Sequence, residues 1–267
     1  MKYKQYTKSH NLELLKKIDS TERFTSEELS WITKQEQSKE FKTRESLLRW
    51  YLSQNAIKLP ALGFLIQHLN DERFKNILSL GAGPCVLEYL LKCALPEDSK
   101  VIAADFNSFY IEKAKLHFPS IIPLKFDFFN DDITELQKKS GVDFDVAVFF
   151  GSAYVMDDVQ FINLFRGLKR TGVRQIIDFY AGYIPTSDLP KMFIRDIRSS
   201  IVSRLRKIPI TKGILNKIKP VGSSYGGKFH GYARSHSELR RLYKEAGVNL
   251  IRETSVEPYK YVAICEC

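Results

Sequence analysis

The sequence predicts an α/β fold: a doubly wound, mostly parallel seven-stranded sheet with a C-terminal antiparallel hairpin and a helical N-terminal cap. From residue 75 onward, short apolar runs alternate with helical stretches, the pattern of a parallel sheet with right-handed crossovers. The last two β-rich runs, 248–255 and 259–265, are joined by only three residues. A link this short excludes a parallel crossover and favours a hairpin.

The N-terminal part, residues 1–70, contains no strand-like run and is predicted to be helical. Apolar residues with helical spacing follow the candidate N-caps Thr43 and Ser46, and a second amphipathic stretch follows Pro60. Two interpretations remain open: a cap packed on the main domain, or a lid that closes over a substrate.

The main domain, residues 71–267, is predicted to contain five strands before the hairpin. We expect them at 77–80, 101–105, 122–127, 144–150 and 174–179, with helices at 84–93, 108–117, 133–139 and 159–169. A basic insert at about 184–227 interrupts this alternation. A helix at 237–246 follows, which Gly247 ends.

Composition narrows the functional classes. The chain has 267 residues, of which 44% are hydrophobic and 27% charged, as in ordinary globular proteins. Its four cysteines are too few for a disulfide scaffold, and no His/Cys spacing suggests zinc, so we expect no metal. Residues 1–17 contain no apolar signal segment and no run is long enough to span a membrane. We therefore expect a cytoplasmic protein, with peripheral attachment to the inner membrane surface as an alternative.

A glycine turn and two acids mark a ligand crevice. Gly81-Ala82-Gly83-Pro84 follows the first strand and opens a helix, where glycines permit a tight turn and close approach of a nucleotide-like ligand. Asp105 ends the second strand and can bridge ribose hydroxyls, and Asp127 with Phe128 ends the third and can contact adenine. Each acid alone is equally explained as a helix cap or a solvated turn residue.

Together these motifs resemble the methyl-donor-binding motifs of class I S-adenosylmethionine-dependent methyltransferases. The final helix and hairpin resemble the end of that fold, and the likeness covers roughly residues 72–180 and 228–267. Two positions depart from the family: it often has an acid where this chain has Ser79, and a third glycine where it has Cys85. The resemblance implies S-adenosylmethionine as cofactor, bound by Leu80, Gly81, Ala82, Gly83, Asp105, Phe106, Asp127, Phe128, Phe150 and Gly151.

A nicotinamide-dependent oxidoreductase is the competing interpretation of the glycine turn. Its fingerprint requires a glycine where this chain has Val86, and no Tyr-x-x-x-Lys dyad follows the sheet. The closing hairpin also favours the methyltransferase.

Acceptor-side residues are expected in the loops after the fourth and fifth strands and after the insert. His230 is the leading general base, because its unperturbed pKa lies near 6.5, although a surface histidine is the plainer interpretation. Tyr154 is the second catalytic candidate. Tyr180, Tyr232 and Arg234 are candidate acceptor contacts, Arg234 for a phosphate or carboxylate.

The basic insert carries most of the excess charge. The chain has a net charge of +10, and residues 191–220 contain nine cations and one anion. Apolar residues recur at helical spacing between 194 and 208, so the helix could lie on an anionic membrane, form a lid, or simply pack on the core. Nucleic-acid contact is less expected, since few aromatic residues interrupt the basic stretch.

From these observations we expect a methyltransferase acting on a hydroxyl of a saccharide or small metabolite, including a glycan or other acceptor that is phosphorylated or lipid-linked. Membrane contact would use residues 193–219. A nucleic-acid methyltransferase and a non-catalytic adenosyl-binding module are the alternatives.

Overall fold

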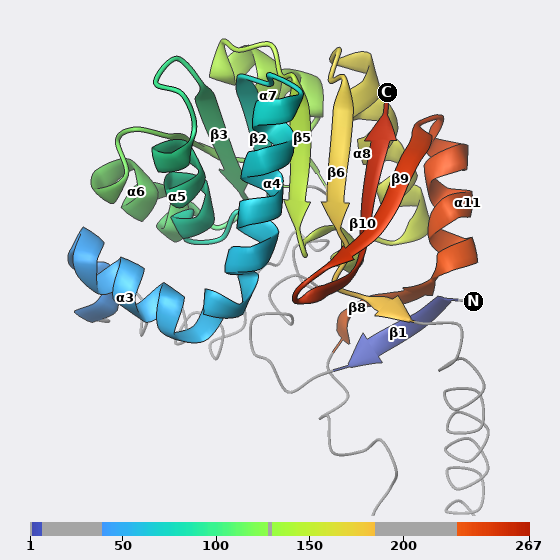
Figure 1. Cartoon of the computed structure of the whole chain (residues 1–267), viewed down its shortest axis with the longest axis horizontal. Helices are drawn as coiled ribbons and strands as arrows, with labels where there is room; N and C mark the ends of the chain where they lie inside the picture. The colour runs from blue at the N-terminus through green and yellow to red at the C-terminus, as the bar shows by residue number, and fades with distance from the viewer. Residues whose placement is uncertain (1, 7–38, 128–129, 185–228) are drawn as a thin grey trace, which may run out of the picture.

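The computed structural model describes residues 2–6, 39–127, 130–184 and 229–267, and these form two sheets (Figure 1). The larger sheet has seven strands in the order β4-β3-β2-β5-β6-β10-β9. All its neighbours pair in parallel except those of β10, which is antiparallel to both β6 and β9. The predicted fold class is therefore confirmed. Its strands are β2 (Asn76–Leu80), β3 (Lys100–Asp105), β4 (Ile122–Lys125), β5 (Val146–Phe150), β6 (Gln175–Phe179), β9 (Asn249–Val256) and β10 (Tyr259–Glu266).

The order of the strands places a crevice between β2 and β5. The chain runs outward from β2 through β3 to β4, then returns to the other side of β2 with β5 and continues outward to β6. The crossovers therefore diverge at β2 and β5, and ligands of open α/β sheets bind at such a point, beyond the carboxyl ends of the strands.

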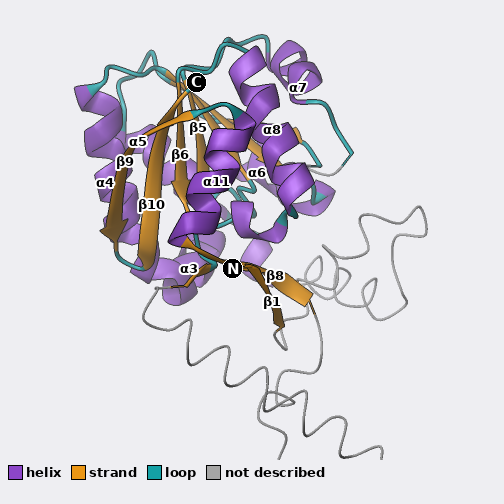
Figure 2. Ribbon diagram, turned by 90° about the vertical axis from the view of Figure 1, so that its right-hand side faces the viewer, coloured by secondary structure: helices purple, strands orange, loops and turns teal. Residues whose placement is uncertain are grey.

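Helices cover both faces of this sheet (Figure 2). One core cluster joins the sheet to α7 (Ile133–Ser140), α8 (Asp158–Arg170) and α11 (His236–Ala246). The other joins it to α3 (Arg44–Asn55), α4 (Leu59–Asp71), α5 (Val86–Ala94) and α6 (Ser108–His117). Short 3₁₀ helices are η1 (Lys39–Phe41), η2 (Ala56–Lys58) and η3 (Ala153–Val155).

Local caps fix where these helices begin. Thr43 caps α3, as expected, by accepting a hydrogen bond from the backbone N–H of Ser46. Asp157 caps α8 in the same way through Gln160, whose side chain bonds back to the N–H of Asp157. Pro60 lies in the first turn of α4, where its missing N–H costs nothing.

The prediction that residues 1–70 are helical throughout is wrong at the N-terminus. Lys2–Tyr6 form strand β1, which pairs antiparallel with β8 (Phe229–Ser235), and β8 pairs in parallel with β7 (Tyr183–Ile184). Residues 2–6 have no apolar periodicity of their own, so their strand depends on a partner more than 220 residues away. This small sheet lies at the end of the main sheet where β5 and β6 end (Figure 1).

The cap helices share the core of the main domain. Leu47 and Tyr51 of α3 and Leu65 of α4 are buried in the same cluster as Ile77 and Val146 of the sheet. This agrees with the interpretation of a packed cap for residues 44–71.

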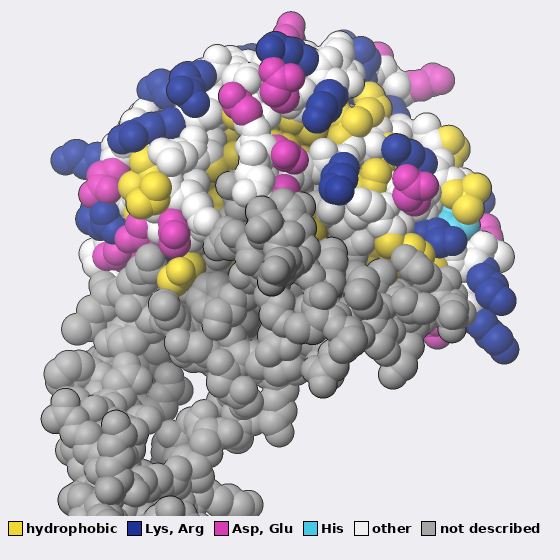
Figure 3. Space-filling view, turned by 180° about the vertical axis from the view of Figure 1, so that it is seen from behind, with side chains coloured by type: hydrophobic (Ala, Val, Ile, Leu, Met, Phe, Trp, Pro, Cys, Tyr) yellow, Lys and Arg dark blue, Asp and Glu magenta, His cyan; other side chains and the backbone are white. Residues whose placement is uncertain are grey.

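Charges are mixed on the described surface. On the face in Figure 3, Lys and Arg side chains alternate with Asp and Glu over the described part of the chain. The basic insert lies outside the described residues, as do the expected membrane contacts at 193–219. Among the helices that the structure describes, none combines the length and the hydrophobicity needed to span a bilayer.

Candidate functional site

The glycine turn between β2 and α5 is folded back on β3. The N–H groups of Gly81 and Ala82 both donate to the carbonyl of Ala104, at 2.8 and 3.1 Å. Gly81 and Gly83 have φ angles of +75° and +57°, which glycine adopts at little cost. The side chain of Leu80 lies in the core, so only its backbone can face the crevice.

Asp105 closes this turn from the neighbouring strand. Its Oδ2 accepts a hydrogen bond from the N–H of Gly83 at 2.7 Å, and its Oδ1 accepts from the N–H of Asn107 at 2.9 Å. Burial raises its pKa to about 6, against the lowering effect of these two backbone hydrogen bonds. The acid predicted to bind ribose therefore lies beside the glycine turn and holds it in place. Phe106 follows it, half-buried.

The third predicted element of the crevice is only partly described. Asp127 is buried and its Oδ2 accepts a hydrogen bond from the side-chain amide of Asn130 at 2.8 Å. Strand β4 ends two residues earlier than predicted, at Lys125, so Asp127 lies in the loop rather than in the strand. Phe128, its expected partner against adenine, lies outside the described residues.

A buried carboxylate occupies the place beside Ser79. Glu88, in the first turn of α5, is 1% exposed, and its Oε1 accepts a hydrogen bond from the hydroxyl of Ser79 at 2.7 Å. Among the described residues its other oxygen, Oε2, has no hydrogen-bond partner. Burial raises the pKa of Glu88 to about 7, although the Ser79 bond lowers it. A buried acid beside the first strand is thus present, but it comes from the helix.

Phe150 ends β5 and Gly151 follows it, against Tyr259 at the start of β10. The ring of Phe150 stacks on that of Phe179 at 4.9 Å between centroids. Gly151 has a φ of +70°, and a Cβ added there would lie 3.0 Å from the ring of Tyr259 and 3.1 Å from its hydroxyl. A glycine is therefore required by both backbone and space. The hydroxyl of Tyr259 is buried and has no partner among the described residues.

A pocket of about 510 Å³ opens at this point. Aromatic side chains dominate its wall and two lysines, Lys58 and Lys260, also line it. Such a mixture of rings and a few charged groups is typical of small-molecule sites. The lining residues are Lys58, Phe150, Gly151, Tyr154, Tyr180, Ala181, Tyr183, Pro258, Tyr259 and Lys260.

Tyr154 lines the pocket as expected for an acceptor-side residue, but its charge state does not suit a base. Burial raises the pKa of its phenol above the usual value. The hydroxyl therefore keeps its proton at neutral pH and can only donate or accept hydrogen bonds.

Arg234 does not face the pocket. Its side chain is 0% exposed, and its guanidinium donates to the hydroxyl of Tyr180 at 2.6 Å, the carbonyl of Met156 at 2.8 Å and Asp158 at 2.9 Å. The predicted contact with an acceptor phosphate is corrected accordingly, because the cation is already paired in the core. Tyr180 does line the pocket with its ring, while its hydroxyl donates to the carbonyl of Tyr232 at 2.7 Å.

His230 and Tyr232 both belong to β8. The backbone of His230 lies in this strand near its start, and the placement of its side chain lies outside what the structure describes. Its role as the base stays a prediction. The ring of Tyr232 is half-buried and lies 5.1 Å from the guanidinium carbon of Arg234.

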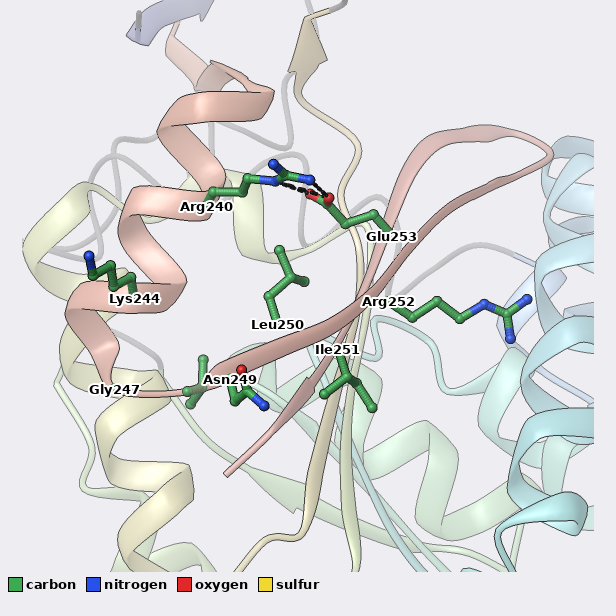
Figure 4. A pocket seen from close by; sticks show the side chains of 9 residues that line it. Arg240, Lys244, Gly247, Asn249, Leu250, Ile251, Arg252 and Glu253 are labelled. Carbon is green, nitrogen blue, oxygen red and sulfur yellow. Dashed lines mark hydrogen bonds and ion pairs between the residues drawn. The ribbon is translucent and has the colours of Figure 1, made fainter.

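A second pocket, of about 610 Å³, shares no lining residue with the first. It is formed by α11 and the first half of β9, at the edge of the sheet, and an ion pair between Arg240 and Glu253 crosses it (Figure 4). Three strands, β5, β6 and β10, lie between β2 and β9, so this pocket is not part of the crevice. Across the described ranges, no group of three or more metal-binding side chains is found.

Several site residues were not predicted from the sequence, among them Lys58, Glu88, Tyr259 and Lys260. Glu88 falls on the buried face of α5, whose other buried residues are apolar, and an acid in that pattern is the one signal that could have identified it. Lys58 and Tyr259 carry no such signal, since each reaches the pocket only through the packing of a distant element.

No family model matches the sequence, and no curated protein matches it. Solved structures do share its fold. They include human N-acetylserotonin methyltransferase in complex with S-adenosylmethionine (14% identity, TM-score 0.53, 85% of this chain and 57% of that one). The S-adenosylmethionine-dependent methyltransferase SibL matches with 15% identity and a TM-score of 0.54, over 81% of this chain and 57% of that one. The mitomycin 7-O-methyltransferase MmcR matches with 17% identity and a TM-score of 0.50, over 84% and 57%.

At these identities the likeness establishes the fold alone: the chain has the class I methyltransferase fold. It spans 57% of the length of each of these three proteins.

Proposed function

We propose that this protein is an S-adenosylmethionine-dependent methyltransferase. The observation that carries the proposal is the crevice beyond β2, β3 and β5, where the glycine turn, Asp105 and Gly151 lie at the ends of adjacent strands. A carboxylate there can bind ribose hydroxyls, and a strand that ends in glycine lets a ligand approach the backbone closely. The human protein of this fold that binds S-adenosylmethionine supports the choice of methyl donor.

We infer that the acceptor is a small molecule that enters the pocket beside Gly151. The rings of Tyr154, Tyr180 and Tyr259 can pack against a flat or ring-shaped acceptor, and Lys58 and Lys260 can pair with an anionic group. These features support a saccharide or another metabolite, including a phosphorylated or lipid-linked one, with methyl transfer to a hydroxyl. MmcR, an O-methyltransferase of this fold, is consistent with transfer to oxygen.

The methyl donor supplies an activated methyl group, so the chain has to align the acceptor and remove its proton. We assign alignment to the hydroxyls of Tyr154 and Tyr259, both of which line the pocket. Since burial raises the pKa of both phenols, neither is the base. That role stays with His230, whose strand adjoins β7 at the pocket.

Two measurements test this function. Calorimetry should detect binding of S-adenosylmethionine, and Asp105→Ala should weaken it by about 1–3 kcal/mol, as expected for a charge-assisted contact. S-adenosylmethionine with a tritiated methyl group is then incubated with lipid, saccharide, nucleic-acid and protein fractions of a cell extract. Label in the lipid or saccharide fraction supports the proposed acceptor, whereas label in nucleic acid overturns it. Donor binding without any transfer would reduce the protein to an adenosyl-binding module.

A further inference from the structure

Glu88 is a buried acid whose hydrogen bonds are incomplete. Its Oε1 is held by Ser79, whereas Oε2 is buried without a partner in the described part of the chain. An unpaired buried carboxylate costs several kcal/mol when it is charged, so such a group is either kept neutral or completed by a ligand.

Besides Ser79 of β2, residues from several other elements surround Glu88. Coulombic effects on pKa values connect it with Lys58 at the end of η2, Tyr51 of α3, Cys85 before α5, Asp105 of β3 and Tyr259 of β10. Asp105 belongs to the crevice, and Lys58 and Tyr259 line the pocket described above. Glu88 therefore lies behind the junction of the methyl-donor crevice and the acceptor pocket.

Lys58 is the one cation among these neighbours. It is half-buried and lines the pocket, and none of the ion pairs among the described residues includes it. Burial lowers the pKa of Lys58, and the charge of Glu88 raises it again. The two groups are thus near enough to affect each other electrostatically but are not in contact.

A negative and a positive side chain separated in this way complement the ammonium and carboxylate of a free amino acid. We propose that Glu88 and Lys58 bind the amino-acid end of the methyl donor, with Oε2 of Glu88 accepting from its ammonium and Lys58 donating to its carboxylate. This assignment rests on the proposed function. It assigns the carboxylate beside the glycine turn to α5, because strand β2 carries Ser79 there and not an acid.

Two related ligands distinguish binding of the amino-acid end from binding of the rest of the methyl donor. S-adenosylhomocysteine carries the amino-acid end, whereas 5′-methylthioadenosine has the same adenosine and sulfur without it. Calorimetry at pH 7.5 on the full chain should show that Glu88→Gln weakens binding of S-adenosylhomocysteine about 10- to 100-fold and leaves that of methylthioadenosine within about twofold. The glutamine can still accept from Ser79, but it presents an N–H₂ group to the ammonium. Lys58→Met should likewise weaken binding of S-adenosylhomocysteine and leave binding of methylthioadenosine nearly unchanged.

Glu112→Gln is the matched control, because it removes the same charge from an exposed position of α6. It should leave both affinities unchanged.

The pH dependence of binding is a second readout. The pKa of Glu88 is about 7, so binding of S-adenosylhomocysteine should tighten several-fold between pH 6.0 and 7.5, relative to methylthioadenosine. That relative gain should disappear in Glu88→Gln, whereas Asp105 affects both ligands alike.

The outcomes are distinct. If the unmodified protein binds neither ligand, the proposed function fails. If it binds both, and Glu88→Gln weakens them equally or not at all, the function stands and the assignment of Glu88 is overturned. A selective loss with an unchanged melting temperature supports it.

Discussion

Gly151 and Tyr259 approach each other closely in the wall of the pocket. A Cβ on residue 151 would lie 3.0 Å from a ring carbon of Tyr259, closer than nine in ten real contacts of a Cβ atom. A side chain at residue 151 would therefore require the ring of Tyr259 to shift, and this contact shapes the wall that faces the proposed acceptor.

The variant Gly151→Ala should consequently destabilise the protein by more than its backbone conformation explains. Gly172→Ala is the matched control, since Gly172 also has a positive φ, +81°, but open space around its Cβ position. The left-handed conformation should cost about 1–2 kcal/mol in both variants. Urea unfolding should show a larger loss for Gly151→Ala. Equal losses would mean that Tyr259 moves aside without cost.

Tyr259→Phe tests the buried hydroxyl that has no described partner. The variant keeps the ring, which lies 5.4 Å from that of Phe179, so the fold and donor affinity should be unchanged. If the hydroxyl orients the acceptor, transfer to the labelled fraction should fall about 10-fold or more, mainly through kcat/KM. His230→Ala provides the comparison: loss of a base should lower the rate about 100-fold. Transfer by Tyr259→Phe at the original rate would remove this residue from the mechanism.

The predicted and observed features of the site differ for a physical reason. Apolar runs and a glycine turn are local signals, so the sheet, Asp105 and Gly151 could be located from sequence. The role of Arg234 could not, because a cation in a polar segment gives no sign that Tyr180, Met156 and Asp158 surround it. Strand β1 was missed likewise, since its pairing with β8 is non-local. Glu88 lies between these two cases. The sequence places an acid on the otherwise apolar buried face of α5, but it does not show what that acid contacts.

Arg234 is expected to act through stability rather than acceptor affinity. Replacing it by methionine removes a fully buried cation and leaves Asp158 and the hydroxyl of Tyr180 with fewer partners. Such a loss costs about 3–5 kcal/mol. Arg241→Met is the control, because Arg241 also pairs with Asp158 but is 41% exposed, so its loss should cost about 1 kcal/mol or less. Thermal unfolding measures both. Similar melting temperatures for the two variants would contradict this assignment.

Cys85 occupies the position where class I methyltransferases often have a third glycine, and its φ of +59° is one that glycine adopts readily. Its side chain is nevertheless fully buried in the core cluster beneath α5. Cys85→Ala should lose thiol packing and retain the strained backbone, whereas Cys85→Gly loses the packing and the strain together. The glycine variant should therefore be at least as stable as the alanine variant, by up to about 1 kcal/mol in urea unfolding. The opposite order would show that packing of the Cβ outweighs the strain.

The unliganded protein should lose stability as the pH rises from about 4.5 to 7. Burial raises the pKa of Asp178 to about 7, although a hydrogen bond from Tyr243 lowers it, and Asp105 and Glu88 shift in the same direction. In that window the native carboxyls hold protons that the unfolded chain has already released. The unfolded state binds fewer protons, so the free energy of unfolding falls as the pH increases.

Asp178→Asn should reduce this fall in the free energy of unfolding between pH 5 and 7.5 by about 2 kcal/mol in urea unfolding, because asparagine has no proton to release. Asp71→Asn, at an exposed position at the end of α4, should leave the fall unchanged. An unaltered slope in Asp178→Asn would mean that this carboxyl is charged in the native protein and stabilised by the nearby Arg234.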